Sequence, residues 1–327
     1  MRRLSKFISL FAVAATALIH SGVVQAQTDF PVRPVKLVVP WPPGGLTDII
    51  SRQIAQKLSE RWAQPVIVDN RAGANGIIGA DLVAKAPADG YTLVTANPET
   101  HGLNHLLYLK VPYDALRDFE PVSLMVTQAL VMVGAPSLQA RTVTELVAYA
   151  KANPGKVRYS SWGRGSTSHL AMELLKSKAG IDMLHVPYKG AGPAFTDVMG
   201  GQVELMLSGI APAVPQVRAG RVHALGITSA ARSAVLPEVP TIAEQGFAGY
   251  DLSTWYGISA PKGTPPDVVS RISEGIRAAL KDPAVVERMA ALGVVIVGST
   301  PDEFRRFNEM SLARWTEIAK NAGVQPE

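Results

Sequence analysis

Hydrophobic and polar residues follow two periods along this chain, which predicts an alternation of strands and helices. The branched apolar run 35–39 is typical of a buried strand. In the segment that follows this strand in the sequence, an apolar residue recurs every four positions up to about residue 63, as in a helix with one buried face. This stripe consists of Ile50, Ile54, Leu58 and Trp62. The next predicted elements are a strand, a helix and a strand, at residues 65–68, 78–83 and 91–96. Together they form a β-α-β-α-β unit, which implies a parallel sheet with right-handed crossovers.

The same alternation returns in the second half of the chain. The predicted strands there lie at residues 129–133, 156–160, 184–186, 203–207, 224–228 and 254–259. Thr142 and Glu145 form a capping box that opens a helix ending near residue 152. Further helices are expected where a cap residue precedes a proline, at Thr264-Pro265, Asp282-Pro283 and Thr300-Pro301. Because no low-complexity linker separates the halves, we expect two α/β lobes joined by strands that cross near residues 127–129 and 226–229.

Two glycine-rich turns each join a predicted strand directly to a predicted helix. They are Pro40–Asp48 and Ser160–His169. Glycine lets the backbone approach a ligand closely, and the first turn of a helix presents unpaired N–H groups with a partial positive charge. We therefore expect an anion to bind at these turns. The hydroxyls of Ser166, Thr167 and Ser168 add donors to the second turn.

Each of these features also has a purely structural interpretation. The glycines can serve packing alone, and Asp48 lies in a first helical turn, where a carboxylate stabilises the helix dipole. The hydroxyls of the second turn can cap their own helix. His169 is expected inside that helix as a packed or capping residue. Three tryptophans near predicted strand ends can wall a pocket, with core packing an equal alternative for the last of them: Trp41, Trp162 and Trp255.

The N-terminus has the pattern of a cleavable signal peptide. Basic residues precede an apolar run at 7–19, and the small residues of Val24-Gln25-Ala26 suit a signal peptidase, so we expect cleavage after Ala26 and export to the periplasm. The remaining chain carries 29 basic and 27 acidic residues, so its formal charge is only +2. No basic block is interleaved with aromatic residues, which argues against nucleic acid as a partner. With 327 residues, 47% of them hydrophobic, the chain is large enough for two cores.

The candidate signatures of catalysis and cofactor binding are incomplete. The chain has no cysteine, which excludes disulfides, thiolate metal sites, a cysteine nucleophile and a lipid-anchored cysteine. His101 and His105 are four apart, but no third metal ligand accompanies them. The turn around Ser166 lacks the G-x-S-x-G order of a nucleophile elbow, and neither glycine cluster completes G-x-G-x-x-G. We therefore expect no catalytic residue, no metal and no cofactor.

Several motifs occur in one order along the chain and carry a resemblance to a known family. They are Val38–Pro40, Gly44–Asp48, Val68–Gly76, Asp89–Thr92, His185–Gly190 and Leu236–Thr241. On these residues the chain resembles the Bug (TctC-like) extracytoplasmic solute receptors of tripartite tricarboxylate transporters, over essentially its whole mature length. The resemblance implies an α/β, two-lobed type II periplasmic-binding-protein fold with a ligand cleft between the lobes. Lobe 1 would comprise 27–128 and 228–327, and lobe 2 would comprise 129–227.

The resemblance also implies which residues bind the ligand. In that family the first glycine loop and the glycine-serine turn of the second lobe hold a carboxylate through N–H groups, hydroxyls and water. The residues carried over are Trp41, Gly44, Gly45, Thr47, Asn75, Gly76, Gly165, Ser166, Thr167, Ser168 and Ser208. Trp41 replaces the usual Phe or Tyr, and Pro42-Pro43 replaces a smaller, more flexible pair. Ser208 stands where many members have Asp or Asn, which makes a plain carboxylate a better candidate than an amino acid.

The implied partners are a small organic carboxylate and the permease subunits of a tripartite membrane transporter. The receptor is expected to be a monomer that delivers its solute to the permease without catalysis. A receptor that feeds a membrane signalling system instead is the alternative, and sequence does not separate the two. A hydrolase is a third class, which would require turnover of an ester.

Overall fold

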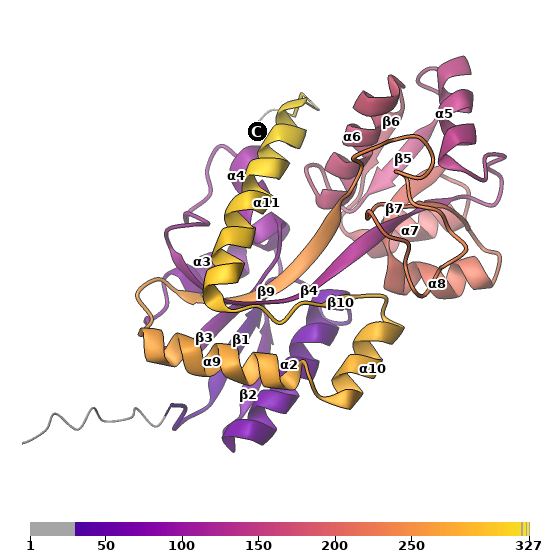
Figure 1. Cartoon of the computed structure of the whole chain (residues 1–327). Helices are drawn as coiled ribbons and strands as arrows, with labels where there is room; N and C mark the ends of the chain where they lie inside the picture. Colours follow the sequence, from indigo (N-terminus) through magenta and orange to yellow (C-terminus); the bar gives the residue numbers. More distant parts are fainter. Residues whose placement is uncertain (1–29, 322, 325, 327) are drawn as a thin grey trace, which may run out of the picture. The chain divides into compact units, whose positions relative to one another are not determined.

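The strand β4 (Phe119–Gly134) is the longest of the fold, and the two halves of the sheet meet along it (Figure 1). The computed structural model describes residues 30–321, 323–324 and 326, and the chain from Pro31 onward forms one compact unit. The predicted signal peptide, residues 1–26, lies outside the described residues. The strands are arranged in the order β2-β1-β3-β9-β4-β7-β5-β6, with β8 and β10 also paired to β4.

The first half of the sheet is built as the hydrophobic periodicity predicts. Its elements are β1 (Val35–Val39), α2 (Leu46–Trp62), β2 (Val66–Asn70), the 3₁₀ turn η1 (Ala74–Gly76), α3 (Ile77–Ala84) and β3 (Thr92–Ala96). β1 lies between β2 and β3 and pairs with both in parallel, which confirms the predicted β-α-β-α-β unit. Within α3, Val83 is buried, but Ile78 and Leu82 are 54% and 38% exposed, so the buried face of this helix is narrower than its composition indicates.

A short helical stretch follows β3 and leads into β4. It consists of the π-helical turn η2 (Glu99–Leu103) and α4 (Asn104–Leu107). Leu103 and Leu107 are buried in the cluster that also contains Leu170 and Leu175 of the second half. The stretch after β3 therefore packs against the other half of the fold.

The second half again alternates helices and strands. Its elements are α5 (Val143–Ala152), β5 (Arg158–Ser161), α6 (Thr167–Ala179), β6 (Leu184–Pro187), α7 (Ala191–Met199), β7 (Leu205–Gly209), α8 (Ile210–Arg218) and β8 (His223–Ile227). β5 pairs in parallel with β6 and β7, and both β7 and β8 run antiparallel to the end of β4. The predicted capping residue Thr142 accepts the N–H of Glu145 at 3.1 Å.

The chain returns to the first half through β9 (Ser253–Pro261), which runs antiparallel to both β4 and β3. β9 begins beside Thr228, whose hydroxyl donates to the Leu252 carbonyl at 2.7 Å. The segment between these residues packs on the second half: Leu236 lies in its core, and the Tyr250 hydroxyl donates to the Ala171 carbonyl at 2.7 Å. The lobe boundary after residue 227 stays a prediction, and this packing favours a boundary near Leu252.

The last part of the chain is mainly helical, as expected. It contains α9 (Pro266–Ala279), α10 (Pro283–Ala291), the two-residue strand β10 (Val295–Ile296) and α11 (Pro301–Asn321). Asp282 and Thr300 accept N–H groups of their helices. The prediction that Thr264 caps α9 is wrong, because its hydroxyl donates to the Pro261 carbonyl at 2.7 Å. The N-cap is Pro265, whose backbone is extended because a proline follows it.

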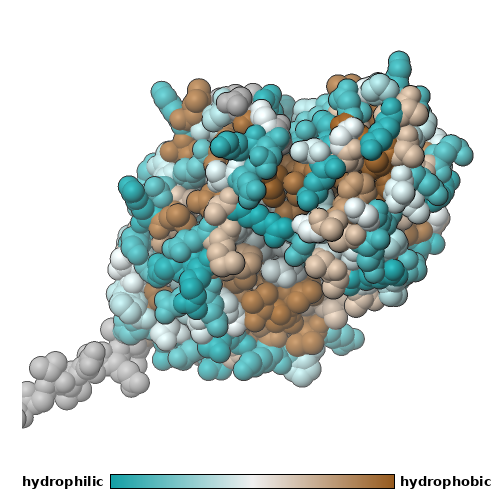
Figure 2. Space-filling view, turned by 45° about the horizontal axis from the view of Figure 1, so that its top comes forward, coloured by the Kyte–Doolittle hydropathy of each residue, from teal (hydrophilic) through white to brown (hydrophobic). Residues whose placement is uncertain are grey.

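Hydrophilic residues cover most of the face in Figure 2, and hydrophobic residues gather there in separate patches. Over the part of the chain that the structure describes, no helix combines the length and the apolar character that crossing a membrane requires.

Two histidines of the second half stack on each other beneath Tyr159 of β5. The rings of His169 (α6) and His185 (β6) are 3.9 Å apart and nearly parallel, and His185 is also 4.9 Å from the Tyr159 ring. Burial is the main cause that lowers the pKa of His169 to about 4, and burial with the neighbouring His169 lowers the pKa of His185 to about 3. Both rings are therefore neutral in the folded protein at physiological pH.

We predict that the free energy of unfolding falls as the pH is lowered from about 6.5 towards 4. Unfolded histidine has a pKa of about 6.5, so in this window the unfolded chain binds protons that the folded chain does not. The effect is at most about 1.4 kcal/mol per pH unit for each such histidine. His185→Phe keeps an aromatic ring in the stack and should make the pH dependence shallower in urea unfolding. His223→Gln removes a histidine outside the stack, and an equal flattening by both variants would contradict this account.

Candidate functional site

The first glycine turn is held in shape by Asp48. Its Oδ2 atom accepts the Gly44 N–H at 3.0 Å and Arg52 Nε at 2.9 Å, and its Oδ1 atom accepts Asn70 Nδ2 at 2.9 Å. Burial by itself would raise the pKa of Asp48, but these hydrogen bonds outweigh it and lower the pKa. The carboxylate is therefore charged and stabilises the start of α2, as its structural interpretation predicts.

The loop above α2 leaves room for a ligand. Gly44 has a φ of +87°, and a Cβ atom built on it would meet nothing within 4 Å. Gly45 is the N-cap of α2, and the first N–H groups of the helix have no partner within it. Thr47 lies in the first turn and is buried. Because the Gly44 N–H is given to Asp48, the donors that this open loop leaves for a ligand are the N–H groups of Gly45 and of the first turn of α2.

Trp41 lies beside this loop with a buried donor. Its Nε1 atom has no hydrogen-bond partner among the described residues. Gly76 makes room for the indole: a Cβ atom there would lie 2.6 Å from Thr100 Cγ2 and 3.4 Å from Trp41 Cζ2. The adjacent Asn75 adopts a left-handed conformation and donates to Asn104 Oδ1 at 2.8 Å. Trp41 and Gly76 are thus neighbours, whereas the Asn75 amide holds η1 against α4.

The three hydroxyls at the start of α6 have different partners. Ser166 is the N-cap: its Oγ accepts the His169 N–H at 3.4 Å and donates to the Gly163 carbonyl at 2.7 Å. Ser168 Oγ donates to the Leu207 carbonyl of β7 at 2.7 Å. Thr167 alone directs its hydroxyl at a carboxylate, that of Glu99. The hydroxyls of Ser166 and Ser168 are therefore bonded within the scaffold. The Ser166 N–H also donates to the Gly163 carbonyl, at 3.2 Å, so of these two residues only Ser168 offers its N–H as a candidate ligand donor.

Gly165 lets another residue approach α6 closely. Its φ is +71°, and a Cβ atom there would lie 2.3 Å from Leu107, so no larger residue fits without a shift. Its N–H donates to His169 Nδ1 at 2.9 Å, which confirms His169 as a capping residue inside the helix. The N-terminus of α6 is therefore covered by the stretch 99–107 that follows β3.

Glu99 is the functional candidate that the sequence did not indicate. Its residue is only 3% exposed, and its Oε1 atom accepts both the N–H and the hydroxyl of Thr167, at 3.2 and 3.1 Å. The side chain of Trp162 and the backbone N–H of Glu99 itself also hydrogen-bond to this carboxylate. Burial is the largest influence and raises the pKa of Glu99 despite these donors. One sequence signal was available: Glu99 lies three residues after the carboxyl end of the predicted parallel strand 91–96, where ligand sites of α/β sheets lie.

Tyr256 of β9 connects this group to α2. Its side chain is hydrogen-bonded with Thr47 and Thr254. Burial and then the nearby Glu99 carboxylate raise the pKa of Tyr256, so the phenol is neutral. Tyr256 is thus hydrogen-bonded at the N-terminus of α2, Glu99 is hydrogen-bonded at that of α6, and the two side chains are near enough for Glu99 to raise the pKa of Tyr256. Both expected anion-binding turns therefore converge on one place.

Ser208 lies near this place but makes no hydrogen bond to its members. It is buried in β7, its Oγ donates to the Gly209 carbonyl at 3.1 Å, and its backbone pairs beside Val131 of β4. The adjacent Leu207 accepts from Ser168, so the end of β7 lies next to the start of α6.

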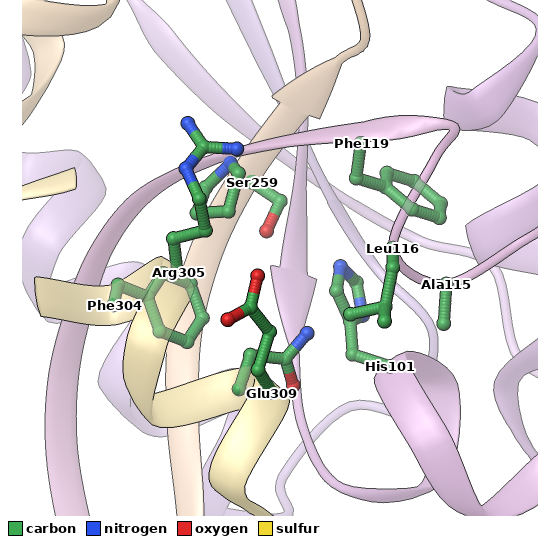
Figure 3. A pocket seen from close by; sticks show the side chains of 10 residues that line it. His101, Ala115, Leu116, Phe119, Ser259, Phe304, Arg305 and Glu309 are labelled. Atoms are coloured by element: carbon green, nitrogen blue, oxygen red, sulfur yellow. The ribbon is translucent and has the colours of Figure 1, made fainter. Parts of the chain in front are cut away.

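A separate cavity lies between η2, residues 115–121, β9 and α11 (Figure 3). It has a volume of about 40 Å³, and three buried polar atoms that line it have no hydrogen-bond partner among the described residues: His101 Nε2, Ser259 Oγ and Asn308 Oδ1. A water molecule requires roughly 10–15 Å³, so the cavity has room for a few waters and is too small for an organic acid. Burial is the main cause that lowers the pKa of His101 to about 3, so its ring is neutral.

Residues 30–321, with the few described positions after them, contain no group of three or more His, Asp or Glu side chains that could hold a metal ion. His105 Nε2 contacts the Tyr113 carbonyl at 2.6 Å.

Trp255 is buried with Phe304 and donates to Ser311 Oγ at 3.0 Å, so core packing is the correct interpretation of this tryptophan.

Comparison with known proteins agrees with this geometry. The family described as "Tripartite tricarboxylate transporter family receptor" matches residues 50–324. Protein BugT of Bordetella pertussis is 40% identical, over 99% of this chain and 99% of its own length.

Two solved structures from Rhodopseudomonas palustris are similar throughout. Rpa4515 with adipate has a TM-score of 0.86 and 37% identity, covering 91% of this chain and 100% of its own. MatC with bound malate has a TM-score of 0.81 and 32% identity, covering 88% and 99%. These similarities confirm the predicted α/β periplasmic-binding-protein fold. The chain belongs to the tripartite tricarboxylate transporter receptor family, the Bug or TctC family of solute-binding receptors.

Proposed function

We propose that this protein is a periplasmic receptor that binds a small organic carboxylate between the N-termini of α2 and α6 and delivers it to a tripartite membrane permease. The observation that carries the proposal is the carboxylate already held at α6, where Thr167 donates both its N–H and its hydroxyl to Glu99. A helix N-terminus with such donors is an anion site. The adipate and malate bound by two similar receptors support the same ligand class.

The proposed site combines donors of both turns. From the first turn we include Trp41, Gly45 and Thr47, with Gly44 keeping the loop open. From the second turn we include the N–H groups of Thr167 and Ser168, with Gly165 and Ser166 shaping the turn. Asn75 and Gly76 shape the wall beside Trp41, and Ser208 lies behind α6. We place the site in a cleft between two lobes that close on the solute about β4 and the start of β9. This division assigns residues 27–128 and the last part of the chain to lobe 1, and residues from 129 to about Leu252 to lobe 2.

Export by a signal peptide cleaved after Ala26, action as a monomer and the absence of catalysis complete the proposal. The family is one of solute-binding receptors, which supports a transport role. A receptor that signals to a membrane sensor would use the same site, and adjacent permease genes or an adjacent sensor-kinase gene would separate the two.

We predict that a carboxylate raises the melting temperature of the mature protein. A ligand that binds only the folded state adds about 2.7 kcal/mol of stability at one hundred times its dissociation constant. The measurement is a thermal-shift screen with adipate, malate, citrate, aromatic acids, amino acids and a neutral sugar. A shift with the sugar and none with any acid would refute the anion site.

Trp41→Phe should weaken carboxylate binding roughly ten- to hundredfold in calorimetry. The variant keeps the aromatic wall but removes the buried indole N–H, and a hydrogen bond to a charged group contributes about 1.5–3 kcal/mol, where about 1.4 kcal/mol corresponds to tenfold. Trp255→Phe is the matched control: it removes the bond to Ser311 and should lower the melting temperature with little change in affinity. Unchanged affinity of Trp41→Phe would place its N–H outside the site.

Ser166→Ala should lower the stability of the unliganded protein by about 1 kcal/mol, since it removes the cap of α6, and should leave affinity nearly intact. Melting temperature and calorimetric affinity are measured side by side. A large loss of affinity at unchanged stability would instead assign the Ser166 hydroxyl to the solute.

A further inference from the structure

Glu99 occupies the position that the proposed function assigns to the solute. Its carboxylate takes the Thr167 N–H and hydroxyl, and Trp162 and its own backbone supply the remaining donors. The donors at α6 come from one half of the fold, whereas Glu99 comes from the stretch after β3 in the other half. The contact therefore joins the two halves at the site.

Burying the Glu99 side chain at this contact costs free energy. Glu99 is almost fully buried, and none of the ion pairs between described residues includes it. Removing a carboxylate from water carries a large free-energy penalty, and hydrogen bonds from neutral donors, with the helix dipole, offset only part of it. The position at α6 is thus already occupied by the protein's own carboxyl group, whose charged form is costly there because it is buried.

A solute carboxylate cannot share this position with Glu99. Thr167 has one N–H and one hydroxyl proton, and both are directed to the Glu99 Oε1 atom. Two carboxylates within a few ångströms of each other repel, and one must leave or accept a proton. Displacement suits this structure because Glu99 begins the π-helical turn η2, in which His101 departs from helical φ and ψ values, and such irregular turns cluster at functional sites.

We propose that Glu99 determines the specificity and affinity of this receptor as a built-in competitor, holding the anion position at α6 until a solute carboxylate displaces it. The inference rests on the proposed function. The measured free energy of binding is then the free energy that the solute carboxylate gains at α6 minus the free energy that Glu99 loses when it leaves this position. A solute whose second group only weakly engages the first turn fails to displace Glu99, so the competitor selects for acids with donors or acceptors at both ends.

The test compares Glu99→Gln with the wild-type mature protein by calorimetry, using adipate and malate as probes. The amide keeps the size and one acceptor oxygen but removes the charge, so both probes should bind at least tenfold more tightly. Glu238→Gln is the matched control, because it makes the same change of charge at an exposed position, and its affinity should equal that of the wild type.

A double-mutant cycle gives the second measurement. In the wild type, Thr167→Val weakens both the hydrogen bonds to Glu99 and those to the solute, so the affinity for the solute should change little. In the Glu99→Gln background the competing side chain is bound more weakly, and Thr167→Val should lower the affinity for the solute by a clearly larger factor. Such non-additivity is expected only of residues that interact.

Two results with these probes would overturn the inference. Unchanged affinity of Glu99→Gln, with a lowered melting temperature, would make Glu99 a structural cap of α6. Weaker binding by Glu99→Gln would make Glu99 a partner of the solute and not its competitor. In both cases carboxylates still bind to the wild type, so the inference fails while the proposed function stands. If neither protein binds any acid, the proposed function fails with it.

Discussion

The N–H groups at the start of α6 need an acceptor, and the structure around the candidate site is arranged to meet that need. Thr167 donates to Glu99 through its backbone and its hydroxyl, Gly165 donates to His169, and Ser166 caps the next turn. Because the two Thr167 donors point to a place that Glu99 reaches from the other half of the fold, satisfying them also brings the halves together. One interaction thus links local helix chemistry to the arrangement of the whole site.

The long strand β4 makes this convergence possible. Its first part pairs with β9 and its last part with β7 and β8, so a single strand fixes where the two groups of helices begin. The C-terminal helix α11 contacts both η2 and α6, and its Trp315 is buried in the same cluster as Leu107. A movement of the halves therefore has to rearrange η2 and α11 together with the Glu99 contact.

Much of this fold could be predicted from local patterns. The strand at 35–39, the helix behind it and the caps at Thr142, Asp282 and Thr300 follow from periodicity and cap chemistry. Thr264 was misassigned because the proline pair after it moves the helix start by one residue. The second crossing was harder to place, since the segment 229–252 is held by contacts such as Tyr250 to Ala171 that no local pattern encodes.

The sequence indicates which turns form the candidate site, but not which of their donors are already bonded to other residues of the protein. The glycine turns and the hydroxyls of residues 166–168 indicate donors, but which hydroxyl is free depends on long-range partners such as Leu207 for Ser168. Glu99 lies 68 positions from Thr167, so its role emerges only in the folded chain.

The most direct measurement is a pair of crystal structures of the mature protein, without solute and with adipate. We expect Glu99 on Thr167 in the first, and in the second an adipate carboxylate on the Thr167 N–H with Glu99 moved away. Adipate bound elsewhere, with Glu99 still on Thr167, would contradict this account.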